Sequence, residues 1–206
     1  MFHLNARGIA KNVGLINAGY KGGLLHDFLI THKHILLILP SLKLDSSIDG
    51  YFARVQSDNT QAMRVLVVDR QNLKLKREFE LEPGFAFHFG NAWEETDGTI
   101  HFDASLYPDV TALHQLSEVM QGAIQNPNAK AQTALFTLKP NGTSMKNLVE
   151  GVSEFPRIYN HLVGKRNRLL FTLSATTSKL WNDTVSCLNI ETGKKECFVY
   201  GNDYLV

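Results

Sequence analysis

Short apolar runs separated by polar turns dominate the pattern of hydrophobic and polar positions along this chain. An apolar or β-branched run, a turn containing Asn, Asp or Gly, and a second run together predict a β-hairpin. Three such units have their turns at 69–72, 139–142 and 191–194. The pattern therefore predicts an antiparallel all-β protein, either a sandwich or a propeller. The turns are spaced irregularly, by about 70 and then about 50 residues, and share no sequence signature, but repeating units of about 40–50 residues lean towards propeller blades.

One segment, 108–124, has the period of an amphipathic helix instead. Its apolar residues recur at spacings of three and four, at Leu113, Leu116, Met120 and Ile124. Asp109 is placed to cap the start, and the Asn-Pro pair at 126–127 ends the pattern. We expect a helical insertion near 109–125 whose apolar face packs on strands, in preference to a membrane or partner helix.

Composition narrows the class of protein without identifying it. The 206 residues suit one domain or two small ones, and 44% hydrophobic with 20% charged residues excludes wholesale disorder. A net charge of +1 gives no electrostatic footprint for nucleic acid. No apolar run approaches the ~18 residues of a membrane span. Without a secretory signal pattern, and with Cys187 and Cys197 too few for a disulfide framework, a reduced cytoplasmic location is expected.

Candidate chemistry lies in the histidines, since no nucleophile elbow, phosphate loop or dinucleotide fingerprint is present. His32 and His34 are predicted to share one face of a strand, either as a metal pair or at the solvated mouth of that strand. His26 lies between glycines and an apolar strand, and His88 among four aromatic residues. An apolar shell suits both a metal site and a buried structural histidine. Glu154 precedes Phe-Pro, where it could orient a ligand histidine, pair with Arg157 or remain exposed.

Three collinear motifs carry a resemblance to a known family. HDFLIT around His26, FHFGNAWEE around His88 and SEFPRI around Glu154, with Gly164 and Arg168 downstream, resemble three motifs of the carotenoid cleavage oxygenases. That family includes the retinal pigment epithelial protein and the lignostilbene dioxygenases. The flanking sequence at 12–16, 39–40 and 188–193 also resembles that of the family, so the resemblance covers nearly the whole chain.

The resemblance implies a seven-bladed β-propeller with iron on its axis. Residues 1–206 are then expected to form one partial propeller domain of about three to four blades. His26 and His88 match two of the family's four histidine ligands to Fe²⁺, and Glu154 matches one of three glutamates that support those ligands. The chain has less than half the family's usual length, and the remaining ligands have no counterpart in it. It is therefore expected to be an internal fragment.

The implied activity is Fe(II)-dependent dioxygenation. O₂ adds across a conjugated double bond of an apolar polyene or a stilbene, and two carbonyl products leave. Phe87, Phe89 and Trp93 are candidates to line the substrate tunnel, with core packing the alternative for at least two of them. No feature of the sequence indicates whether the substrate is a carotenoid, an apocarotenoid or a stilbene.

Other expectations concern alternatives and partners. The main alternative is a truncated, non-catalytic propeller remnant, and an isomerase or hydrolase on the same scaffold is a third. His26 and His88 are each expected to begin an inner strand and to converge on one axis, with Glu154 bonded to His88. Open blade edges predict self-association, and peripheral membrane contact is left open by the resemblance.

Overall fold

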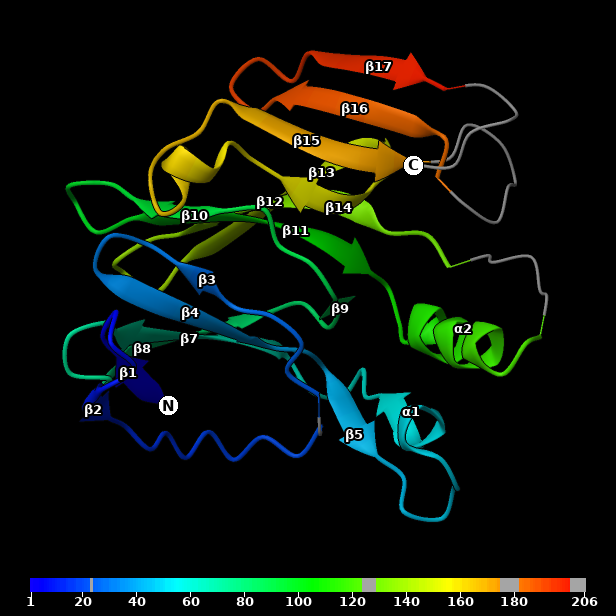
Figure 1. The fold of residues 1–206 in the computed structure, drawn as a ribbon, viewed down its shortest axis with the longest axis horizontal. Coiled ribbons are helices and arrows are strands. Elements are labelled where there is room, and N and C mark those ends of the chain that lie inside the picture. Colours follow the sequence, from blue (N-terminus) through cyan, green and yellow to red (C-terminus); the bar gives the residue numbers. More distant parts are fainter. Residues whose placement is uncertain (23, 124–128, 175–181, 201–206) are drawn as a thin grey trace.

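The computed structural model describes residues 1–22, 24–123, 129–174 and 182–200, in which antiparallel sheets predominate. Figure 1 shows three larger sheets that follow one another in chain order. The first sheet comprises β3 (Leu29–Ile30), β4 (His34–Leu39), β7 (Met63–Asp69) and β8 (Leu75–Leu81), in that order. The second sheet comprises β10 (Ala92–Glu94), β11 (Ile100–Tyr107), β12 (Gln132–Leu138) and β13 (Ser144–Val152), with β9 (Phe85–Ala86) also paired to β11. The third sheet comprises β14 (Glu154–Arg157), β15 (Leu169–Ser174), β16 (Thr184–Asn189) and β17 (Lys195–Val199).

Smaller elements decorate this array. Two-stranded ribbons are formed by β1 (Phe2–Leu4) with β2 (Ala10–Val13) and by β5 (Leu42–Leu44) with β6 (Val55–Ser57). The helices are α1 (Tyr51–Arg54), α2 (Thr111–Met120) and a 3₁₀ turn at Asn160–Leu162. Among the described residues, no helix has both the length and the hydrophobicity that crossing a membrane requires.

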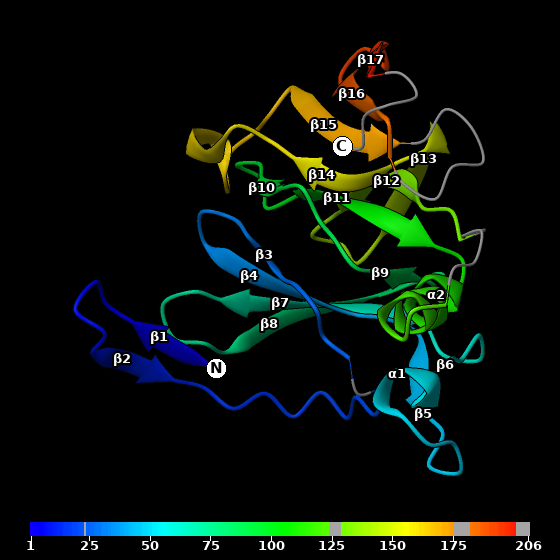
Figure 2. The same cartoon turned by 45° about the vertical axis from the view of Figure 1, so that its right-hand side comes forward.

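The three predicted hairpins are all present, as β7–β8, β12–β13 and β16–β17. Each one supplies two strands of a different sheet, and within each sheet every pair of neighbouring strands is antiparallel. Stacked antiparallel sheets of consecutive strands are the architecture of propeller blades. The fold is thus all-β, as predicted from the spacing of apolar runs, and Figure 2 shows the same layering from a second direction.

The main core lies between the first and second sheets. Alternate side chains of the first sheet, such as Leu36 and Val65, are fully buried against the second sheet. From the second sheet, Phe102 and Phe136 meet this layer as stacked rings, with centroids 4.5 Å apart on directly paired residues. This packing fixes the two sheets relative to each other and so positions the loops at their ends.

The predicted helix is present but its packing differs from the expectation. Leu113 is fully buried, whereas Leu116 is 45% and Met120 70% exposed. The expectation of a continuous apolar face on the strands was therefore wrong, because one turn alone of α2 reaches the cluster formed by Phe85 and Tyr107. Asp109 accepts a hydrogen bond from the Thr111 N–H at 2.8 Å, close to its predicted capping role. Ile124 and the predicted stop at 126–127 lie outside the described residues.

Candidate metal centre

His88 is held by the backbone of the second sheet. It lies between β9 and β10, and its carbonyl oxygen accepts a hydrogen bond from the Ser105 N–H of β11 at 3.0 Å. The side chain is half-buried, with its ring at 4.7 Å from that of Phe155. The backbone of His88 is therefore held in place, and its imidazole faces the third sheet.

Glu154 reaches this imidazole from the third sheet. Its Oε2 lies 2.8 Å from His88 Nδ1, which is the bond predicted from the sequence, and it also accepts the N–H of Phe155. Burial, followed by the neighbouring Glu154 carboxylate, raises the pKa of Tyr107. Glu154 Oε1 is buried without a hydrogen-bond partner in the described part of the chain. A carboxylate on Nδ1 fixes the ring tautomer and leaves Nε2 free to bind a metal.

The loop that follows His88 is clamped from two sides. Asp103, buried in β11, accepts the N–H groups of Gly90 and Asn91 at 2.8 and 3.0 Å. A Cβ at position 90 would come within 2.4 Å of the Asp103 carboxylate, so glycine is required there. Asn91 in turn bonds to Lys165 and Asn167 of the third sheet's loop. These bonds fix the distance between the histidine of one sheet and the glutamate of the next.

His26 approaches His88 from the segment that precedes the first sheet. The two rings lie 5.4 Å apart between centroids, at an interplanar angle of 83°. Phe87 meets His26 at the same separation. The three side chains of the motifs thus come from segments belonging to three successive sheets and gather at one place.

One geometric expectation was wrong. Neither histidine begins a strand: His26 lies three residues before β3, and His88 lies in the link between β9 and β10. His88 is on irregular backbone because residues 87–91 form no strand pairs between β9 and β10, and His26 belongs to the irregular segment that precedes β3. The side chain of His26 is exposed.

These donors can be tested against an iron site. Metal–nitrogen bonds of about 2.1 Å bring the centres of two imidazoles on one ion to within roughly 6.5 Å, and the observed 5.4 Å meets that condition. The free Nε2 of His88 and the supporting carboxylate also fit. Over the described ranges, however, no group of three or more His, Cys, Asp or Glu is placed to hold a metal ion. The two histidines and the glutamate therefore fit an iron site in donor type and in spacing.

The predicted tunnel residues occupy three different environments. Phe87 borders both imidazoles. Phe89 is buried in the core between the first two sheets, and Trp93 stacks on His101 at 5.1 Å. Packing thus accounts for two of the three. Sequence reasoning missed Phe155, whose ring covers His88 and whose φ of +51° is rare for a residue with a side chain. Its place directly after Glu154 was the available signal.

The His-Lys-His segment also departs from the expectation. Thr31 and His34 close a turn by hydrogen bonds of 2.8 and 2.9 Å, so β4 begins at His34 and His32 is outside the strand. The two rings therefore do not share a strand face. His34 Nδ1 instead lies 2.7 Å from Glu94 Oε2, which also accepts the Thr31 hydroxyl. This pair joins the first sheet to the second.

Comparison with known proteins identifies the family. The model of the family described as retinal pigment epithelial membrane protein matches residues 6–206. The chain belongs to this family, which is that of the carotenoid cleavage oxygenases. It is 29% identical over 187 residues to the carotenoid 9,10(9',10')-cleavage dioxygenase 1 of Arabidopsis thaliana. This match covers 87% of the chain and 34% of the relative. It is 24% identical over 154 residues to the apocarotenoid-15,15'-oxygenase of Synechocystis, covering 71% and 31%.

Solved structures agree on the fold. A cobalt-substituted Synechocystis ACO superposes with a TM-score of 0.72 at 22% identity, covering 87% of this chain and 39% of that one. An ACO/RPE65 chimera in its trigonal crystal form gives 0.76 at 21% identity, covering 98% and 43%. The chain spans about a third of the length of its curated relatives. The fold is accordingly that of part of the family's propeller.

Proposed function

We propose that this chain carries part of the iron(II) centre of a dioxygenase that cleaves carotenoids or apocarotenoids. The observation that carries the proposal is that the His26 and His88 rings lie 5.4 Å apart between centroids, with Glu154 hydrogen-bonded to Nδ1 of His88. The names of the relatives give carotenoid and apocarotenoid substrates and so favour a polyene over a stilbene.

In this proposal the three residues have distinct roles. His26 and His88 would each hold the iron through a neutral imidazole nitrogen. Because neutral ligands bring no charge, Glu154 supplies negative charge through the His88 ring and fixes its tautomer. Iron(II), when bound, supplies the activation of dioxygen that oxidative cleavage of a C=C bond requires. Phe87 and Phe155 border the rings with apolar surface that excludes water and suits a polyene.

The second candidate is a non-catalytic propeller segment. It is favoured by one observation, that two histidines stand together without a third ligand in the part of the chain that the structure describes. Under both hypotheses we expect the 206-residue chain alone to bind iron weakly and to cleave no apocarotenal at a useful rate. Stoichiometric iron with steady turnover in this chain would show a more complete site than the one proposed.

The decisive experiment places the chain in a full-length relative. Residues 6–206 replace the matching segment of the Arabidopsis dioxygenase, and iron content and apocarotenal cleavage are measured. We expect His88→Ala to abolish both, and Glu154→Gln to lower activity about 10–100-fold while the chimera stays folded. The glutamine keeps the shape of the side chain and removes its charge.

His161→Ala is the matched control, since His161 is an exposed histidine that stacks on Tyr159 and lies outside the three motifs. It should leave iron content and turnover unchanged. Retention of iron in His88→Ala, or an equal loss in His161→Ala, would overturn the assignment. A chimera that binds iron but does not turn over in any form would favour the non-catalytic alternative.

A further inference from the structure

The third sheet docks on the second mainly through polar contacts. The three clusters of buried apolar side chains in the described ranges have no member from the third sheet, whereas the largest of them joins the first sheet to the second. At the second interface, Glu154 Oε2 lies 2.8 Å from His88 Nδ1, and Ser153 Oγ, directly before β14, lies 2.6 Å from Thr133 Oγ1. Hydrophobic packing has no preferred direction but a hydrogen bond does, so the register of this docking depends on a few polar side chains.

Asn91 makes several of these contacts with its side-chain amide, which is almost fully buried. Its Nδ2 donates to the Lys165 carbonyl oxygen and to Asn167 Oδ1, both at 2.8 Å. Its Oδ1 accepts the Gly164 N–H at 3.0 Å. Both donors and the acceptor of the amide are therefore used. A reversed amide would place its NH₂ group against the Gly164 N–H, so these bonds also fix the orientation of the amide.

The main chain of Asn91 is fixed to the second sheet. Its N–H donates to Asp103 Oδ2 at 3.0 Å, and its carbonyl oxygen accepts the Asp103 N–H at 3.2 Å. The loop that its amide holds, 158–168, joins β14 to β15, and these two strands pair with each other. Because β14 begins with Glu154, holding this loop also holds the Glu154 carboxylate in register with His88.

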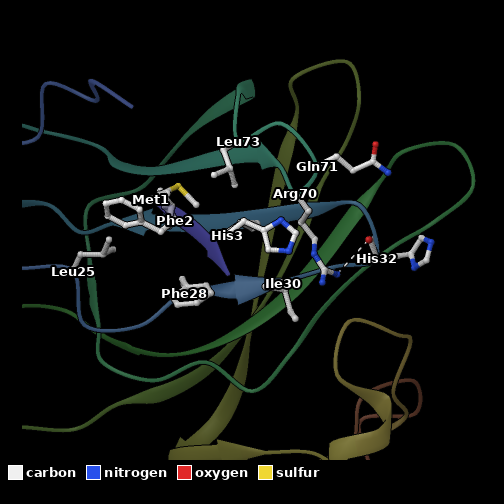
Figure 3. Close-up of a pocket in the computed structure, with 12 residues that line it drawn as sticks. Met1, Phe2, His3, Leu25, Phe28, Ile30, His32, Arg70, Gln71 and Leu73 are labelled. Atoms are coloured by element: carbon white, nitrogen blue, oxygen red, sulfur yellow. Dashed lines mark hydrogen bonds between the residues drawn. The ribbon is translucent and has the colours of Figure 1, made fainter. Parts of the chain in front are cut away.

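The same loop also touches the first sheet. Gly164 has a φ of +76°, and a Cβ there would lie 3.4 Å from the Thr31 carbonyl carbon, so the loop packs closely on the turn between β3 and β4. Arg70 fixes that turn, because its Nη1 donates to the carbonyl oxygens of Thr31 at 2.6 Å and of His32 at 3.3 Å (Figure 3). The loop therefore joins all three large sheets at one place.

From this arrangement we propose that Asn91 is a positioning residue of the candidate metal centre. Its amide sets the register in which the third sheet docks on the second, and this register brings Glu154 Oε2 onto His88 Nδ1. The carboxylate then keeps the proton of the imidazole on Nδ1 and leaves Nε2 as an unprotonated donor. The effect on iron rests on the proposed function, whereas the effect on the His88 tautomer does not.

The tautomer is measured on the metal-free 206-residue chain by long-range ¹⁵N–¹H NMR of the imidazoles. The measurement is made at about pH 8, where an ordinary histidine is neutral. The signal that is missing from His88→Gln assigns the His88 ring. We expect one tautomer, with the proton on Nδ1, in the wild-type chain. Asn91→Ala should give a mixture of both tautomers, because the carboxylate is no longer held on Nδ1.

A second variant and a matched control separate this role from a general loss of stability. Asn91→Asp has nearly the same shape, still accepts the Gly164 N–H and loses both donors, so it should also mix the tautomers. Asn189→Ala is the control, since Asn189 Oδ1 accepts two N–H groups within the turn at 189–193 of the third sheet. It should leave the His88 tautomer unchanged. Circular dichroism confirms that each variant keeps its strands.

The chimera that carries residues 6–206 tests the link to iron. Asn91→Ala should lower iron affinity about tenfold, and adding it to Glu154→Gln should cause little further loss, because both changes act through one hydrogen bond. Mixed tautomers with unchanged iron affinity would support the positioning role and contradict the proposed function. A proton that stays on Nδ1 in the folded Asn91 variants, or an equal mixture in Asn189→Ala, would overturn the positioning role.

Discussion

Asp103 shows how one buried residue supports the candidate site without touching a ligand histidine. Its carboxylate lies beneath the loop that carries His88 and receives two main-chain N–H groups from that loop. Burial raises the pKa of Asp103 to about 7, although the hydrogen bonds from Gly90 and Asn91 lower it. Desolvation of the charge thus outweighs the two bonds.

This buried carboxyl group predicts a pH dependence of stability. Its ordinary pKa is 3.8 and its folded value is about 7, so the folded chain holds the proton more tightly than the unfolded chain. The free energy of unfolding should therefore fall as pH rises between about 4 and 7, by at most about 4 kcal/mol from this group. Urea unfolding across this range measures the slope.

Asp103→Asn should remove that contribution, since asparagine does not titrate. The variant also turns one acceptor into a donor and is expected to be less stable overall. The difference in slope between the two proteins is the informative quantity, because the other carboxylates contribute equally to both. The same slope in both proteins would refute the assignment.

At the scale of elements, α2 is attached through a single turn. Leu113 packs among Phe85 and Tyr107, while Leu116 and Met120 of the same helix face solvent. The helix is thus attached near its start, where Leu113 is buried and His114 Nε2 lies 2.8 Å from the Val55 carbonyl oxygen.

Leu113→Ala should lower the free energy of unfolding by about 2–5 kcal/mol, because it leaves a cavity in a closed cluster. Met120→Ala, on the same helix but exposed, should change it by less than about 0.5 kcal/mol. Chemical denaturation of both variants measures the two effects. Equal losses would show that Met120 is buried in solution.

The elements differ in how far the sequence predicts them. Hairpins such as β12–β13 follow from local turn chemistry at 139–142, and the bond between His88 and Glu154 followed from motif resemblance. The solvent-facing side of α2 did not follow, because periodicity reports apolar residues and not what covers them. The pair of His34 with Glu94 was also not predicted. The two residues are 60 positions apart and belong to different sheets, so the local sequence around one carries no information about the other.

At the scale of the whole molecule, the outer strands β8, β13 and β17 leave one backbone edge of each large sheet unpaired in the described part of the chain. On β17, Phe198 is 63% exposed. Unpaired edges with apolar side chains promote association between chains.

We therefore expect the 206-residue chain to self-associate with rising concentration in sedimentation velocity. Phe198→Lys should shift the chain towards monomer, because a charge on an edge strand opposes pairing. Thr143→Lys, in the turn between β12 and β13, is the charge-matched control and should have little effect. A wild-type chain that remains monomeric at all concentrations would contradict the expectation.

The hydrogen bond between His88 and Glu154 has a consequence for the order of events during synthesis. Each large sheet is built from consecutive strands, so a nascent chain leaving the ribosome can complete the first and second sheets in turn. At that stage His88 is in place, but its carboxylate partner has not yet emerged. The tautomer of the imidazole is fixed only when the third sheet docks. On the proposed role of His88, iron affinity should therefore rise only when the third sheet docks, and not when the first two sheets are complete.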